Sequence, residues 1–272
     1  MKNFLSGISE QHFRDHHLLL VEHAEQISAM TDDVEDQAHN IERTALRSIP
    51  AYRNITALRT KAKNPLRRMK TSKSTNQALQ TVYLARHGET AWTLSGQHTG
   101  LTDLTLTERG ERNARRLEER LGGLSFAKVF TSPLQRTRRT CELAGFGAVA
   151  EIDRDLVEWN YGDYEGRRTA DIHKERPDWQ IFRDGCPGGE SPSEVRARAD
   201  SVIKRLRAIK GDVLLFSSGH FLRVFAARWL GFEPGAGRFF LLSTASLSAL
   251  SYEHNLSQPA IRLWDDDRHV GD

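Results

Sequence analysis

Cysteines and long apolar runs are scarce in this chain of 272 residues. The two cysteines, Cys141 and Cys186, are too few for a disulfide framework and lack the spacing of metal ligands. The first residues, MKNFLSGISEQ, lack the apolar run of a signal peptide, and no later stretch has the roughly 20 apolar residues that span a bilayer. We therefore expect a cytoplasmic protein with no membrane partner.

A strong excess of charge of either sign is also lacking. The chain contains 39 Lys and Arg against 36 Asp and Glu, which gives a net charge of +3. So small an excess does not indicate a nucleic-acid partner. Hydrophobic residues make up 38% of the chain and charged residues 28%, as in ordinary globular proteins, and no internal repeat occurs. The length suits one large domain, or one domain with an appendage.

The amino-terminal part has a helical pattern. Residues 12–48 contain no Gly or Pro, and Pro50 then breaks the pattern. Apolar side chains recur there at every seventh position, which predicts one or two helices: Phe13, Leu20, Ile27, Val34 and Ile41. Because this spacing is typical of helices that pair, we expect a homo-oligomer formed through this extension.

A basic segment follows the helical pattern. Residues 59–73 contain no acidic residue, and no aromatic side chain that could stack on nucleic-acid bases. With the polar residues that follow, this composition predicts a solvated linker. We therefore divide the chain into a helical extension at residues 1–50, a basic flexible linker at residues 51–79 and a main domain at residues 80–272.

The main domain alternates short apolar runs with amphipathic segments. The runs TVYLARHG, KVFTSP and DVLLFSSGH predict three strands. Helices are predicted after the caps or turns at Thr107, at Ser132 with Pro133, at the capping box Ser191–Glu194, and over FLRVFAARWLG. This alternation predicts an α/β fold, a three-layer sandwich with a largely parallel central sheet.

Polar side chains follow each of the three predicted strands. Arg86 and His87 end the first strand, Ser132 and Arg136 follow the second, and His220 follows the third. Ligands of open α/β sheets bind at the carboxyl ends of the strands. We therefore expect these side chains to form one site.

Five segments together resemble one known family. Their order and composition resemble the histidine phosphatase superfamily, in its phosphoglycerate-mutase-like branch. The segments are LARHGETAW, GQHTGLTDLTLTERG, SPLQRTRRT, LVEWNYGDYEG and FSSGH. The resemblance covers nearly all of residues 80–268. Within the branch, SGQHTGLTD, EWNYGDYEG and WQIFRDGCPGGES are most similar to sedoheptulose-bisphosphatase and acid-phosphatase-like members.

The resemblance implies a phosphatase that needs no metal or other cofactor. It would hydrolyse a small phosphorylated metabolite, such as a sugar phosphate, with His87 accepting the phosphoryl group. Arg86, Arg136 and His220 would donate hydrogen bonds to the phosphoryl oxygens, which carry the charge in transfer. Nearby guanidinium charge should lower the pKa of His87 and keep its ring neutral. The rival assignment makes His220 the nucleophile.

A carboxyl group is needed to protonate the leaving alkoxide and then to activate water. Glu158 matches the family's acid–base position. Asp163 and Glu165 lie in the same loop and are its competitors. Glu89, next to the nucleophile, is expected to brace the loop rather than to react.

The resemblance also suggests residues that bind the substrate. Thr99 and Gly100 match a segment that touches the phosphate or substrate, and Tyr161 could form a wall of the pocket. Arg183 matches a position that contacts a second acidic group. We interpret His98 as an ordinary surface or loop residue.

The extension shows a second resemblance. FRDHHLLLVEHAEQISAMTDDVEDQAHNIERTALRSIPAY is similar to one inner segment of the ferritin-like, DNA-protecting mini-ferritins. Glu25 matches the glutamate of their iron site, but Val21 stands where that family has an aspartate. We expect no iron site, and a segment that docks on the main domain or on itself.

Three alternatives compete with hydrolysis. The first is a phosphoglycerate-mutase type of phosphoryl transfer, which the compact stretch between Gly166 and Gly188 argues against. The second is a scaffold with an inactive domain, but none of the five residues expected in catalysis is missing. The third makes the extension an iron- or DNA-associated module.

Overall fold

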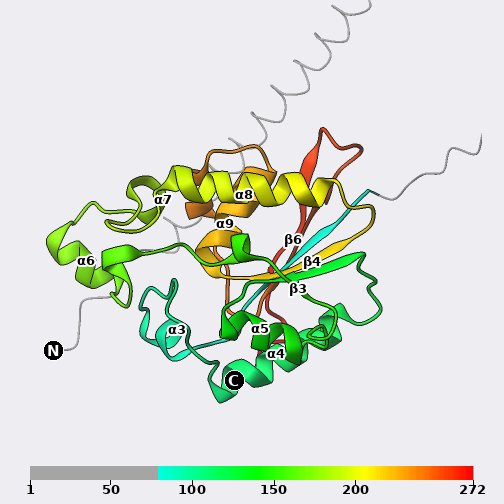
Figure 1. Ribbon diagram of the computed structural model, residues 1–272, viewed down its shortest axis with the longest axis horizontal. Helices are drawn as coiled ribbons and strands as arrows, with labels where there is room; N and C mark the ends of the chain where they lie inside the picture. The colour runs from blue at the N-terminus through cyan, green and yellow to red at the C-terminus, as the bar shows by residue number, and fades with distance from the viewer. Residues whose placement is uncertain (1–78, 272) are drawn as a thin grey trace, which may run out of the picture. The chain divides into compact units, whose positions relative to one another are not determined.

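The computed structural model describes residues 79–271 (Figure 1). The predicted helical extension, with its resemblance to mini-ferritins, lies outside the described residues. So does all of the predicted linker except Leu79, and these features stay predictions. No helix within residues 79–271 is long and apolar enough to cross a membrane.

One six-stranded sheet forms the centre of the described part, with strand order β3-β2-β4-β1-β5-β6. The first four of these strands run parallel, and β5 and β6 are antiparallel to their neighbours. The strands are β1 (Val82–Arg86), β2 (Lys128–Thr131), β3 (Glu151–Ile152), β4 (Val213–Ser217), β5 (Leu247–Tyr252) and β6 (Pro259–Asp266). The three predicted strands are β1, β2 and β4, and the prediction of a largely parallel sheet is confirmed.

Helices cover both faces of the sheet (Figure 1). On one face lie α8 (Pro192–Arg207) and α9 (Gly219–Trp229), and on the other lie α4 (Glu108–Leu121) and α5 (Gln135–Leu143). Alternate residues of β1 separate into the two cores, because Leu84 packs with α8 and α9 whereas Ala85 packs with α4 and α5. The predicted three-layer sandwich is therefore confirmed.

Two helix starts agree with the local sequence signals. The Thr107 hydroxyl accepts the Gly110 N–H at the start of α4. At the start of α8, Ser191 and Glu194 form a capping box with Pro192 in the first turn.

The prediction that Pro133 opens a helix was wrong. Helix α5 begins at Gln135, and its capping residue Leu134 makes no side-chain cap bond. The Gln135 N–H instead donates to the carboxylate of Asp103 at 2.7 Å. Because this cap comes from a residue far away in the sequence, the local signal misplaced the helix start.

Short helical segments connect these layers. They are α3 (Ala91–Ser95), η1 (Arg154–Leu156), η2 (Gly162–Tyr164), α6 (Thr169–Glu175), α7 (Ile181–Asp184) and η3 (Pro234–Phe239). Figure 1 shows α3, α6 and α7 at the left, the end toward which β1 runs. The segments that follow the parallel strands thus gather beside the carboxyl ends of those strands.

Arg198 ties the loop after β3 to helix α8. Its Nη1 donates to the carbonyl oxygens of Asp155 and Val157 at 2.8 and 2.7 Å. Its Nε and Nη2 donate to the carboxylate of Glu190 at 3.0 and 2.8 Å. The guanidinium carbon also lies 4.5 Å from the centre of the Phe221 ring. Since the Arg198 side chain is only 12% exposed, this cation fixes both ends of the loop in a shielded environment.

Replacing Arg198 should strongly destabilise the domain. We expect Arg198→Met to lower the free energy of unfolding by about 3 kcal/mol, because Glu190 and two carbonyl groups lose their shielded partner. Arg196→Met, on the same helix, removes only exposed ion pairs with Asp200 and Glu233 and should change the free energy of unfolding by less than about 1 kcal/mol. Urea denaturation of both variants measures the difference, and equal losses would contradict the anchoring role.

Candidate active site

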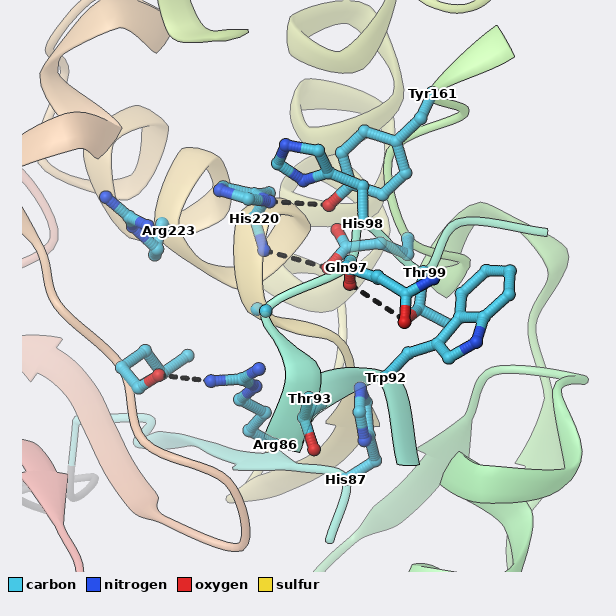
Figure 2. Close-up of a pocket in the computed structure, with 14 residues that line it drawn as sticks. Arg86, His87, Trp92, Thr93, Gln97, His98, Thr99, Tyr161, His220 and Arg223 are labelled. Atoms are coloured by element: carbon cyan, nitrogen blue, oxygen red, sulfur yellow. Dashed lines mark hydrogen bonds between the residues drawn. The ribbon is translucent and has the colours of Figure 1, made fainter. Parts of the chain in front are cut away.

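A cavity of about 200 Å³ lies where β1 and β4 end (Figure 2). Its lining comes from the end of β1, the loop around α3, the loop after β3 and the start of α9. The polar and aromatic lining side chains are Arg86, His87, Trp92, Thr93, Gln97, His98, Thr99, Glu158, Tyr161, His220 and Arg223. Four of the five predicted catalytic residues therefore line one cavity, and Arg136 is the exception.

His87 is buried, with 2% of its surface exposed. Its Nδ1 lies 2.8 Å from the carbonyl oxygen of Gly88, so Nδ1 carries the proton and Nε2 keeps its lone pair. Burial, followed by the charges of Arg136 and Arg86, holds the pKa of His87 well below its usual value. The sequence predicted the effect of the arginines, but burial is the larger cause. The ring is therefore a neutral imidazole whose Nε2 carries a lone pair and no proton.

Arg86 brings a cation to the end of β1. Its Nη1 donates to the carbonyl oxygen of Leu242 at 2.5 Å, and its buried Nε has no hydrogen-bond partner. Burial lowers its pKa, while Glu158 acts in the opposite direction. It forms no ion pair with the described residues. Its free N–H groups are therefore available to an anion in the cavity.

Arg136 is fully buried behind the cavity rather than in its wall. It donates to three carbonyl oxygens of one loop, at 3.1, 2.8 and 2.9 Å, namely those of Thr99, Gly100 and Thr102. Its Nε is buried without a partner. Arg136 thus holds the loop that carries Thr99, and its charge acts on His87.

Glu158 is fixed at the start of helix α9. Its Oε1 accepts the N–H groups of Trp159 and Phe221 at 2.9 and 2.8 Å, and its Oε2 accepts that of His220 at 3.0 Å. The capping residue Ser218 makes no side-chain cap bond, so Glu158 satisfies the first-turn N–H groups instead. This buried carboxyl group therefore has a fixed position in the cavity wall.

The two competing carboxylates, Asp163 and Glu165, do not line the cavity, and neither does Glu89. Glu165 accepts the N–H groups of Gly100 and Thr102, and Asp163 lies beside Gly188. Glu89 accepts hydrogen bonds from Thr107 and Arg109, as expected of a residue that braces its loop.

Among the described residues, no three His, Cys, Asp or Glu side chains are grouped so that they could hold a metal ion.

His220 and Tyr161 form a hydrogen-bonded pair (Figure 2). The Tyr161 oxygen lies 2.5 Å from His220 Nδ1. Burial, followed by Glu158, raises the pKa of Tyr161 well above its usual value, so the phenol stays protonated. Its O–H group donates a hydrogen bond to His220 Nδ1. Burial, followed by Arg223, lowers the pKa of His220. His220 is therefore neutral with its proton on Nε2, which makes it a hydrogen-bond donor and a poor nucleophile there.

The predicted substrate-binding residues lie in different places. Thr99 and Tyr161 line the cavity, but Gly100 does not. A Cβ at Gly100 would lie 2.6 Å from the carbonyl oxygen of Trp159, so this position supports the loop through its backbone. Arg183 is also outside the cavity, because its half-exposed side chain pairs with Asp184. The cavity therefore does not support a direct substrate contact for Gly100, or the predicted contact of Arg183 with a second acidic group.

Sequence reasoning missed several lining residues. His98, interpreted as a surface residue, is 9% exposed, and burial lowers its pKa to about 4. Its ring centre lies 4.7 Å from that of Tyr161. Arg223 lies three residues after His220 on a predicted helix, a spacing that puts both on one face and could have identified it. Trp92 and Gln97 lie within the recognised segments, but no local signal sets them apart.

Comparison with known proteins gives a consistent result. A model of the histidine phosphatase superfamily (branch 1) matches residues 82–267. The acid phosphatase of Mycobacterium tuberculosis is 41% identical over 182 residues, covering 65% of this chain and 89% of that protein. The sedoheptulose 1,7-bisphosphatase of Saccharomyces cerevisiae is 32% identical over 246 residues, covering 66% of this chain and 90% of that protein.

A solved structure shares the fold. The protein of the open reading frame Rv3214 from Mycobacterium tuberculosis superposes with a TM-score of 0.66 and 38% identity. The superposition covers 69% of this chain and 97% of that one. The resemblance seen in the motifs is thereby confirmed: the chain belongs to branch 1 of the histidine phosphatase superfamily.

Proposed function

We propose that this phosphatase hydrolyses small phosphate monoesters in two steps, through a phosphohistidine on Nε2 of His87. The position of the buried His87 ring is the observation that carries this proposal. The Nδ1–H group of His87 donates a hydrogen bond to the Gly88 carbonyl group, which leaves the lone pair on Nε2. The same cavity contains Arg86, a cation that forms no ion pair with the described residues. An uncharged nucleophile next to fixed positive charge suits attack on a dianionic ester.

In the first step, Nε2 of His87 attacks the phosphorus atom and the bond to the ester oxygen breaks. Arg86 and the Nε2 proton of His220 donate hydrogen bonds to the non-bridging oxygens, which carry the charge in the transition state. The attack leaves positive charge on the imidazole, and the hydrogen bond from Nδ1 to Gly88 stabilises it. Arg136 adds its charge from behind the cavity.

Glu158 serves both steps as the proton carrier. Its carboxyl group gives a proton to the leaving alkoxide, which departs as an alcohol. The resulting carboxylate takes a proton from water as the water oxygen attacks phosphorus and the bond to Nε2 breaks. Phosphate leaves, and His87 and Glu158 return to their starting states.

The substrate is a small phosphorylated metabolite, such as a sugar phosphate. A cavity of about 200 Å³ accommodates a phosphate group and a few further atoms. The names of the acid phosphatase and sedoheptulose 1,7-bisphosphatase relatives support this class of substrate. Mutase-type transfer would share the first step and differ only in passing the phosphoryl group to a substrate hydroxyl instead of water.

Replacing the nucleophile should abolish turnover. We expect His87→Asn to lower kcat for 4-nitrophenyl phosphate at least about 1,000-fold in the presence of EDTA. His254→Asn, which alters an exposed ring outside the cavity, should leave kcat unchanged. Far-ultraviolet circular dichroism checks folding, and substantial activity in a folded His87→Asn variant would refute the assignment.

Glu158→Gln should affect substrates according to their leaving groups. Alkyl phosphates need a proton on the departing oxygen, whereas 4-nitrophenolate leaves without one. We expect kcat/KM to fall about 100-fold more for glycerol 1-phosphate than for 4-nitrophenyl phosphate. A purely structural role at the start of α9 predicts equal losses for the two substrates, so the ratio of the losses decides between the roles.

The rate at which the enzyme becomes phosphorylated should change little at acidic pH. Protonation consumes the lone pair of Nε2, and a lowered pKa moves this loss to more acidic pH. An ordinary imidazole would be about 90% protonated at pH 5.5 and about ten-fold slower. We expect the first-turnover release of 4-nitrophenol to change less than about two-fold between pH 7 and 5.5. A loss with a midpoint near pH 6.5 would show that His87 has no such shift.

A further inference from the structure

A second chamber of about 440 Å³ adjoins the active-site cavity. The two share three lining residues, His98, His220 and Arg223. Because the cavity around His87 holds little more than the phosphate, the alcohol portion of a larger ester must extend elsewhere. The second chamber is directly next to the place where the phosphate would lie.

The walls of this chamber combine apolar surface with positive charge. Trp179, Ile181, Phe182 and Phe239 supply the apolar part, and Arg223 and Arg238 supply the charge. No Asp or Glu is among its lining residues within the described part of the chain. The chamber can thus pack a carbon skeleton, but it has no carboxylate that could neutralise its two arginines.

Arg223 is the half-buried cation at the junction of the two spaces. Its Nε and Nη2 donate to the carbonyl oxygens of Gly237 and Arg238 at 3.0 and 3.2 Å. Its guanidinium carbon lies 4.6 Å from the centre of the Phe182 ring, which holds the group in place. It forms no ion pair with the residues that the structure describes. Figure 2 shows it beside His220 and well apart from His87.

Arg238 lies at the outer rim of the same chamber. Its guanidinium carbon is 4.5 Å from the centre of the Phe239 ring, and the Phe239 side chain is largely exposed. Within the described chain Arg238 has no carboxylate partner either. The hydrogen bond from Arg223 Nη2 to the carbonyl oxygen of Arg238 brings the two residues together at one wall.

We propose that Arg223 and Arg238 bind a second anionic group, a carboxylate or another phosphate, carried by the alcohol portion of the substrate. This inference rests on the proposed hydrolysis at His87. The carbon skeleton packs against the apolar wall while the distal anion meets the two guanidinium groups. Guanidinium groups only donate hydrogen bonds, so a neutral hydroxyl group would leave their charge uncompensated, whereas an anion matches both the donors and the charge. The sequence assigned this role to Arg183, which the structure places outside both spaces.

Matched aryl phosphates test the inference. Phenyl phosphate carries no second anion, whereas 4-carboxyphenyl phosphate and 4-phosphonophenyl phosphate carry one at the far end of the same ring. We expect Arg223→Gln and Arg238→Gln each to lower kcat/KM for the two probes with a second anionic group at least ten-fold more than for phenyl phosphate. Whichever probe the unmodified enzyme prefers identifies the anion as carboxylate-like or phosphate-like. Arg207→Gln alters another arginine that lies over a ring, that of Trp229 away from the site, and should change none of the rates.

The outcomes separate the two proposals. If Arg223→Gln lowers all three rates equally, Arg223 contacts the transferred phosphate and the inference is wrong, although hydrolysis stands. If neither variant changes the preference among the probes, the second anion site does not exist. If the unmodified enzyme releases phosphate neither from the three probes nor from alkyl phosphates, the proposed function itself fails.

Discussion

Desolvated positive charge beside an uncharged imidazole is the interaction on which the rest of this site depends. The guanidinium groups of Arg86 and Arg136 are removed from water without carboxylate partners, which is costly unless other groups compensate. Backbone carbonyl oxygens provide that compensation, three of them for Arg136. Carbonyl groups stabilise a cation without cancelling its charge. Burial is the larger cause of the lowered pKa of His87, and the positive field that attracts phosphate acts in the same direction.

The scaffold places one rigid element behind each reacting group. Parallel pairing of β1 with β4 sets Arg86 opposite Ser217, so the segments carrying His87 and His220 leave the sheet side by side. The first turn of α9 receives the Glu158 carboxylate, and Arg198 holds the loop that presents it. One set of hydrogen bonds thus caps the helix and also positions the proposed acid–base group. Mobility in that loop would cost both stability and proton transfer.

Local sequence signals predicted what is locally encoded. Periodicity gave the central strands, and the capping box gave the start of α8 to the residue. An error arose where a partner lies far along the chain, because Asp103 caps α5. Glu158 caps α9 in the same long-range way, which no local signal indicates. The burial of His98 likewise depends on rings from distant segments. The motif resemblance correctly predicted that four residues share one cavity: Arg86, His87, Glu158 and His220. It could not distinguish Arg136 and Gly100, which support a loop, from residues that line the cavity.

The two nitrogens of His87 have different roles, and this difference gives the most direct test. Glu158→Gln should form the phosphoenzyme from 4-nitrophenyl phosphate but hydrolyse it slowly, so that the intermediate accumulates. After an alkaline quench, ³¹P nuclear magnetic resonance and peptide mass spectrometry would locate the phosphate. The account predicts an acid-labile phosphate on Nε2 of His87. Phosphate on Nδ1, on His220 or on an oxygen atom, or a burst of 4-nitrophenol with no covalent phosphate, would contradict it.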